Sequence, residues 1–124
     1  MKIAVTSTGE KNTSSLNPRF GRCEYFIIID TETKEWEAVA NPATQARGGA
    51  GSQAAQFIAN QGVEAVISGR YGPNAYTALA AAGIQPLIIS GQETVDAAFD
   101  KFLAGELEEA SAATGPQLHG GGSQ

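Results

Sequence analysis

The sequence predicts an α/β domain, and three observations carry this prediction. The chain has 124 residues, of which 42% are hydrophobic, a length and composition typical of one globular domain with its own core. Two strand-like segments joined by a short polar turn occupy the first half. Strand-like and helix-like segments alternate in the second half. We therefore expect a mixed five-stranded sheet with three helices over residues 1–110, with strands at 2–6, 25–29, 36–40, 63–67 and 84–89.

The first half is expected to form a strand, a long loop and a hairpin. Residues 2–6 are apolar and partly β-branched. Residues 7–23 show no periodicity and are rich in Ser and Asn, and a loop of this length in a compact domain is usually functional or mobile. The uninterrupted apolar run at 25–29 suits a central strand covered on both faces. The polar turn at 30–34 joins it to an edge strand at 36–40.

Capping residues and apolar stripes place the three helices. Ser52 is expected to cap the first helix, which ends at Gly62. Pro73 lies in the first turn of the second helix, which ends at Gly83. Thr94 is expected to cap a third helix, whose apolar residues follow the i, i+3, i+4, i+7, i+8 spacing of one buried face.

The two ends of the chain carry different signals. Gly105 breaks the third helix, although residues 107–110 could extend it. Residues 111–124 are rich in Gly, Ser and Ala without an apolar stripe, so we expect a disordered tail. Residues 1–9 resemble neither a signal peptide nor a membrane span, and a cytoplasmic location is the expectation.

Composition excludes several classes of function. The formal net charge is −5 and the isoelectric point about 4.7, which argues against nucleic acid or an anionic membrane as partner of the whole surface. A single Cys cannot form an internal disulfide. One Cys and one His cannot supply a four-ligand zinc site.

All four arginines fall in loops that the topology brings to one end of the sheet. If the strand at 25–29 is antiparallel to its neighbours, the other four strands point the same way, and ligands of open α/β sheets bind beyond the carboxyl ends of such strands. These ends lead into residues 7–23, 41–51, 68–74 and 90–94, whereas the lysines are scattered. Guanidinium groups and helix N-termini together predict an anion site. The arginines are Arg19, Arg22, Arg47 and Arg70.

The alternative is that these arginines cluster by chance or pair with Glu10 and Glu24. In the anion site, backbone or side-chain donors would come from the same loops. The candidates are Ser7, Thr8, Gly49, Gly51, Gly72 and Asn74.

Two residues are candidate metal ligands. Arg19 and Arg22 flank Cys23 in the sequence and could favour its thiolate, which is a ligand for soft metals. The alternative for Cys23 is a small buried hydrophobic residue. His119 could reach the site on a flexible arm, and the alternative is a solvated tail residue.

Catalytic motifs are weak, and we predict a protein that is not an enzyme. Residues 49–54 match G-x-G-x-x-A, but no apolar strand precedes them, and no P-loop sequence occurs. The only His lies in the expected tail, where it cannot hold a triad geometry. The alternatives are a small nucleotide- or phosphate-binding enzyme that uses the glycine-rich loops, and an adaptor, which an exposed Phe20 would favour.

Several segments resemble a known family over residues 1–104. The segment 18–26 (PRFGRCEYF) contains an FGR-x-x-x-F signature, and 48–51 (GGAG), 62–69 (GVEAVISG) and 72–75 (GPNA) follow in order. This combination is similar to the dinitrogenase iron-molybdenum cofactor biosynthesis proteins. The resemblance implies a ribonuclease-H-like α/β three-layer fold, without nuclease activity, because the carboxylates that bind two metal ions are not evident.

The resemblance also implies a cargo. Small stand-alone members, the orange proteins of sulfate reducers, carry a molybdenum–copper sulfide cluster without a conventional Cys cage, and other relatives bind the iron–molybdenum cofactor or its precursor. It therefore implies a binding or carrier protein for an anionic metal–sulfur cluster, with molybdenum and copper first and an iron–sulfur precursor as alternative. A protein donor or acceptor of the cluster is the expected partner. Many relatives carry His- or Met-rich segments, whereas this chain has only His119 and Met1.

Overall fold

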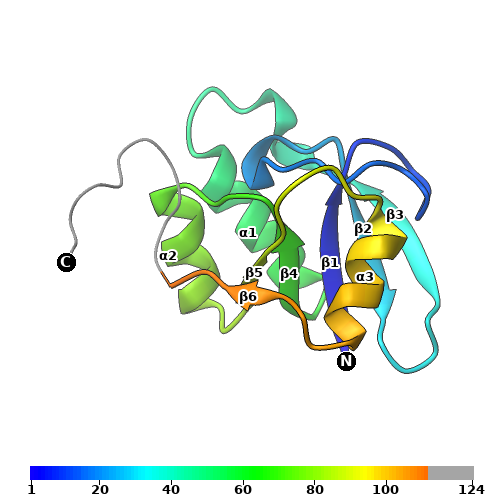
Figure 1. Ribbon diagram of the computed structural model, residues 1–124. Coiled ribbons are helices and arrows are strands. Elements are labelled where there is room, and N and C mark those ends of the chain that lie inside the picture. The colour runs from blue at the N-terminus through cyan, green and yellow to red at the C-terminus, as the bar shows by residue number, and fades with distance from the viewer. Residues whose placement is uncertain (112–124) are drawn as a thin grey trace.

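The computed structural model describes residues 1–111 and shows a sheet between two helical layers (Figure 1). The three α-helices are α1 (Ala50–Asn60), α2 (Pro73–Ala81) and α3 (Val95–Leu103), and two short 3-10 helices are η1 (Phe20–Arg22) and η2 (Pro42–Gln45). The strands are β1 (Lys2–Ser7), β2 (Tyr25–Asp30), β3 (Trp36–Ala40), β4 (Val63–Ser68), β5 (Gln85–Ile88) and β6 (Glu108–Glu109).

The sheet has the order β3-β2-β1-β4-β5-β6, and its strand directions agree with the prediction. β1, β4 and β5 are parallel, and β2 is antiparallel to both β1 and β3. β1, β3, β4 and β5 therefore point the same way. The predicted mixed α/β sheet with three helices is confirmed.

The predicted number of five strands is wrong, because β6 adds a sixth. It pairs with β5 in antiparallel register, with Glu108 opposite Ile88. The possible helical extension over 107–110 is also wrong: Gly105 turns the chain with a φ of 72°, and the Ala110 N–H then donates to the Pro86 carbonyl at 2.8 Å. Residues 108–110 thus form backbone hydrogen bonds with β5, and they could not form these bonds if they continued α3.

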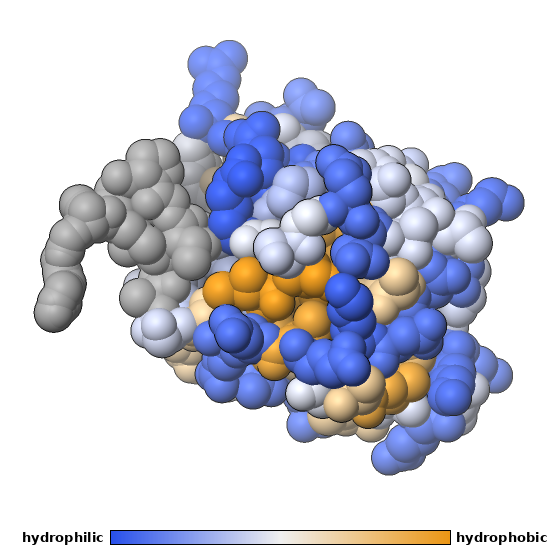
Figure 2. Space-filling model, in the orientation of Figure 1, coloured by the Kyte–Doolittle hydropathy of each residue, from blue (hydrophilic) through white to orange (hydrophobic). Residues whose placement is uncertain are grey.

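Each face of the sheet has its own core, which explains the continuous apolar runs of the central strands. Ala4 of β1 and Phe26 of β2 face α1 and α2, whereas the adjacent Val5 and Ile27 face α3. Helix α3 lies over the β1 side of that second face (Figure 1). Figure 2 shows apolar surface between α3 and β6, where Ile89 and Leu107 help to line a hollow of about 280 Å³.

Of the two predicted N-terminal caps, the one of α3 is found and the one of α1 is not. The Thr94 Oγ1 accepts a hydrogen bond from the Ala97 N–H at 3.3 Å, so the predicted cap of α3 is confirmed. The predicted cap at Ser52 is wrong. Helix α1 begins three residues earlier than this cap predicts, because Gly49 adopts a φ of 72° and its carbonyl accepts from the Gln53 N–H at 2.9 Å. The expected tail, apart from Ser111, lies outside the described residues.

No helix within residues 1–111 is long and apolar enough to cross a membrane.

Candidate functional site

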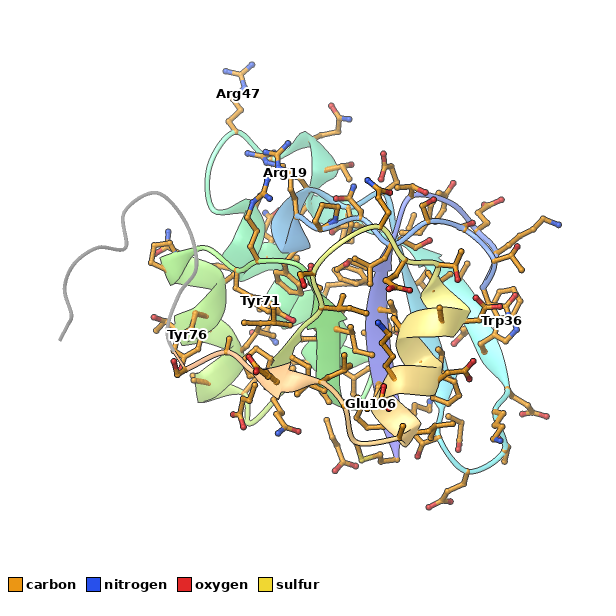
Figure 3. All side chains as sticks on the ribbon, viewed as in Figure 1. Arg19, Trp36, Arg47, Tyr71, Tyr76 and Glu106 are labelled. Atoms are coloured by element: carbon orange, nitrogen blue, oxygen red, sulfur yellow. The ribbon has the colours of Figure 1, made fainter. Side chains whose placement is uncertain are left out.

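The four loops that follow β1, β3, β4 and β5 meet at one end of the molecule (Figure 1). Every arginine of the chain lies in one of the first three of these loops. We call this region the arginine end, defined by Arg19, Arg22, Arg47 and Arg70 together with the N-termini of α1 and α2. All four arginines are exposed. Figure 3 shows Arg19 and Arg47 projecting into solvent beyond this end of the sheet.

Backbone contacts bring Arg19 and Arg70 together across a parallel β-bridge. The Phe20 N–H donates to the Arg70 carbonyl at 3.3 Å, and the Arg70 N–H donates to the Pro18 carbonyl at 2.8 Å. A Cβ at Gly69 would lie 2.6 Å from the Pro18 Cβ, so glycine is needed for the two segments to approach this closely. The long loop after β1 is therefore fixed against the segment after β4.

The buried hydroxyl groups of Thr6 and Ser68 fix this loop to the ends of β1 and β4. The Thr6 hydroxyl donates to the Asn17 carbonyl at 2.5 Å and lies 3.0 Å from the Ser68 Oγ. The Ser68 Oγ in turn lies 3.3 Å from the Pro18 carbonyl oxygen. Sequence reasoning missed both residues. The available signal was a hydroxyl side chain at the carboxyl end of each of two otherwise apolar strands.

None of the four arginines forms an ion pair within residues 1–111. The ion pairs there join Lys101 to Glu93 and the N-terminal ammonium to Glu32. Glu24 accepts a hydrogen bond from the Asn17 side chain at 3.0 Å instead of meeting a guanidinium group. Within residues 1–111, neither Glu10 nor Glu24 forms the ion pair with an arginine that the alternative requires. No carboxylate within residues 1–111 therefore lies within ion-pair distance of these arginines.

Arg22 also has a structural contact. Its Nη1 donates to the Ala46 carbonyl at 3.0 Å, which ties η1 to the loop after η2. The remaining N–H groups of a guanidinium fork stay available to an anion. Arg22 can therefore order the loop that carries Arg47 and still contribute charge.

The N-termini of α1 and α2 lie side by side at this end. Gly51 makes this possible, because a Cβ there would stand 2.8 Å from the Ala75 Cβ. On the other side, a Cβ at Gly21 would lie 3.0 Å from the Gly51 N. Both helix dipoles place partial positive charge beside the arginines. Gly51 thus serves helix packing, and the ligand contact expected at its backbone stays a prediction.

The other predicted donors divide into accessible and occupied groups. The buried Ser7 hydroxyl donates to the Gly9 carbonyl at 2.8 Å, and the Thr8 hydroxyl donates to Ser15 at 3.1 Å, so both shape their own loop. Gly49, Gly72 and Asn74 are exposed at the helix N-termini. These three residues therefore lie at the same end of the sheet as the arginines.

Cys23 lies in the core. Its side chain is fully buried, with the thiol 3.4 Å from the Phe20 carbonyl oxygen, and burial raises the pKa of the thiol to about 12. The expectation that Arg19 and Arg22 favour a thiolate is therefore wrong: burial is the main cause of the raised pKa, and neither arginine acts on it. The small buried residue is the interpretation that fits. Within residues 1–111, no group of three or more His, Cys, Asp or Glu could hold a metal ion. His119 lies outside the described residues.

Two aromatic residues at this end are also buried. Phe20 packs against Phe26 and Tyr71, with ring centroids 5.6 and 5.4 Å apart, so the exposed Phe20 that would favour an adaptor is not found. The Tyr71 hydroxyl donates to the Leu87 carbonyl at 2.7 Å. Phe20 instead anchors η1 and with it the arginines on either side.

The chain is similar in sequence and structure to proteins of one family. The sequence profile described as dinitrogenase iron-molybdenum cofactor matches residues 1–105. An uncharacterized protein of Methanocaldococcus jannaschii is 36% identical over 112 residues, which cover 88% of this chain and 91% of that protein. The apo form of the orange protein from Desulfovibrio gigas matches with a TM-score of 0.89 and 36% identity, over 92% of this chain and 96% of that one. A Thermotoga protein provisionally named NifB matches with a TM-score of 0.81 and 37% identity, over 93% and 97%.

Proposed function

The chain belongs to the dinitrogenase iron-molybdenum cofactor family, and on that basis we propose that it binds or carries an anionic metal–sulfur cluster at the arginine end. The cargo we propose first is a molybdenum–copper sulfide, in line with the similarity to the orange protein, and an iron–molybdenum precursor cluster is the alternative. In this proposal the protein holds the cluster without transforming it.

One observation carries the proposal: four exposed arginines lie at the same end of the sheet as two helix N-termini, and no carboxylate within residues 1–111 forms an ion pair with them. Guanidinium N–H groups and free backbone amides suit an anion that presents several acceptor atoms. The described residues offer no set of ligating side chains, so they fit a cluster held by charge and hydrogen bonds.

Reconstitution of the apo-protein with tetrathiomolybdate and copper(I) tests this proposal. After desalting, we expect retained, stoichiometric molybdenum and copper and a visible absorption band. Arg19→Gln combined with Arg70→Gln should lower the retained metal several-fold, because these exposed residues supply charge without supporting the core.

Lys2→Gln combined with Lys34→Gln is the matched control, since it removes the same charge from exposed residues away from the arginine end. Equal metal loading in the two double variants would show that the arginines do not hold the cluster. If the protein retains no metal but ATP or phosphate raises its melting temperature, the alternative of a small phosphate-binding enzyme is favoured.

A further inference from the structure

A second surface, between α3 and β3, combines exposed apolar side chains with a groove. Trp36 is 40% exposed and Leu103 is 46% exposed, and with Met1 they are the exposed large hydrophobic residues of the described chain. Trp36, Leu103 and Phe99 line a cavity of about 210 Å³. Figure 3 shows Trp36 beside α3, on a side of the molecule well apart from Arg19 and Arg47. We call this surface the α3–β3 face.

The α3–β3 face includes an open sheet edge. Among residues 1–111, β3 is the end strand and pairs only with β2, with Trp36 opposite Ile29 in the register. An end strand presents backbone N–H and C=O groups that another extended segment can pair with. Ile29 lies in the floor of the same cavity, so a segment added beside β3 could place a side chain into it.

The charges around Trp36 are mainly negative. Asp96 and Asp100 line the cavity beside α3, and Asp30, Glu35 and Glu37 line a second hollow of about 300 Å³ on the other side of Trp36. The two cations that line these hollows are Lys2 and Lys34. None of the five carboxylates is ion-paired within residues 1–111. Asp96 accepts a hydrogen bond from the Thr94 hydroxyl and Asp30 accepts from two backbone N–H groups, but each keeps its negative charge. An exposed indole among carboxylates without ion pairs suits a cationic partner, through ion pairs and a cation–π contact.

We propose that the α3–β3 face docks a basic protein segment in extended conformation, which pairs with β3 and alternates Arg or Lys with apolar side chains. Its apolar residues fill the groove between Trp36 and Leu103, and its cations face Asp96 and Asp100. A second copy of this chain is a poorer occupant, because pairing two β3 edges would bring Glu35 and Glu37 of one copy near the same residues of the other. The proposal does not rest on the cluster-binding function.

Trp36 provides the probe, because it is the only tryptophan of the chain. We would titrate the full chain with a capped peptide of four Arg-Val repeats and record Trp emission, together with backbone NMR shifts. The expected result is saturable binding, with shifts confined to β3 and α3. Matched peptides of Glu-Val and Arg-Ser repeats should bind at least about tenfold more weakly, because one lacks the charge and the other the apolar side chains.

Variants locate the interaction. Asp96→Asn with Asp100→Asn should weaken binding about tenfold. Leu103→Ser should weaken it as well and leaves the fold intact, since this side chain is exposed. The matched control, Glu108→Gln with Glu109→Gln, removes two carboxylates from the opposite sheet edge and should change little.

Four outcomes would overturn the proposal: no saturable binding, equal binding of the Arg-Ser peptide, equal weakening by the control variant, or NMR shifts away from β3 and α3. Dimer formation without peptide that shifts β3 resonances would assign the face to a second copy instead.

Discussion

Arg19 and Arg70 are neighbours across a parallel β-bridge although both side chains carry positive charge. Their proximity is enforced by the backbone, because the Arg70 N–H donates to the Pro18 carbonyl and the Phe20 N–H donates to the Arg70 carbonyl. No carboxylate within residues 1–111 forms an ion pair with either of them. An anion that binds between them therefore relieves an unfavourable interaction that the fold maintains.

The proposed cluster affinity should depend strongly on salt. Exposed guanidinium groups are screened at high ionic strength, so the dissociation constant for tetrathiomolybdate should rise about tenfold or more between 0.02 and 0.5 M NaCl. Equilibrium dialysis at several salt concentrations measures this. The Arg19→Gln/Arg70→Gln variant should show a shallower dependence. An affinity that does not change with salt would indicate metal–ligand bonds in place of charge.

Gly51→Ala should destabilise the protein although alanine is the better helix former. The new Cβ would stand 2.8 Å from the Ala75 Cβ and 3.3 Å from the Ala75 Cα, so α1 and α2 must move apart. We expect a loss of roughly 1–3 kcal/mol in the free energy of unfolding by urea denaturation. Gly48→Ala is the control, because a Cβ there meets nothing within 4 Å and its φ lies outside the left-handed region. Equal stability of the two variants would contradict the packing role of Gly51.

Local patterns in the sequence were sufficient for most of the fold. The apolar run of β2 indicated a strand covered on both faces, and Ile27 and Phe26 do face opposite cores. The cap at Thr94 follows from the residue type and the stripe that comes after it. β6 could not be predicted, because two consecutive glutamates carry no strand signal and pair only through contact with the distant β5.

The sequence was sufficient to predict that positive charge gathers at the candidate site. It was not sufficient to predict which side chains there are buried or packed against one another. Topology places Arg19 and Arg70 at one end of the sheet whatever their side chains touch. The burial of Cys23 and the packing of Gly51 against Ala75 depend on segments far away in the chain, which no local pattern reports. The same is true of Thr6, whose hydroxyl meets a carbonyl in the middle of the long loop.

Asn41 should be important for the stability of the arginine end. Its buried side chain accepts from the Ala43 N–H at 2.9 Å and donates to the Cys23 carbonyl at 2.9 Å, which joins η2 to the segment between η1 and β2. Asn41→Ala leaves buried polar groups without partners and should cost roughly 2–3 kcal/mol of unfolding free energy. Thr44→Ala, in the same 3-10 helix, is the control and should cost much less. A comparable melting temperature for Asn41→Ala and the parent protein would contradict this role.

Cys23 should make the protein less stable at alkaline pH. Burial raises the pKa of this thiol from 9.0 to about 12, so between these two pH values the unfolded chain loses its proton while the folded protein keeps it. Stability is therefore unaffected below about pH 9 and falls as the pH rises toward 12. At pH 10 the loss should be roughly 1 kcal/mol relative to pH 8.

Urea denaturation of the parent protein and of Cys23→Ala at both pH values measures this loss. Cys23→Ala should lose less stability between the two pH values than the parent protein. Of the two buried groups whose pKa is raised by burial, Cys23 and Tyr71, the variant keeps only Tyr71. An equal pH dependence would mean that the thiol does not stay protonated in the folded protein, which would reopen Cys23 as a metal ligand.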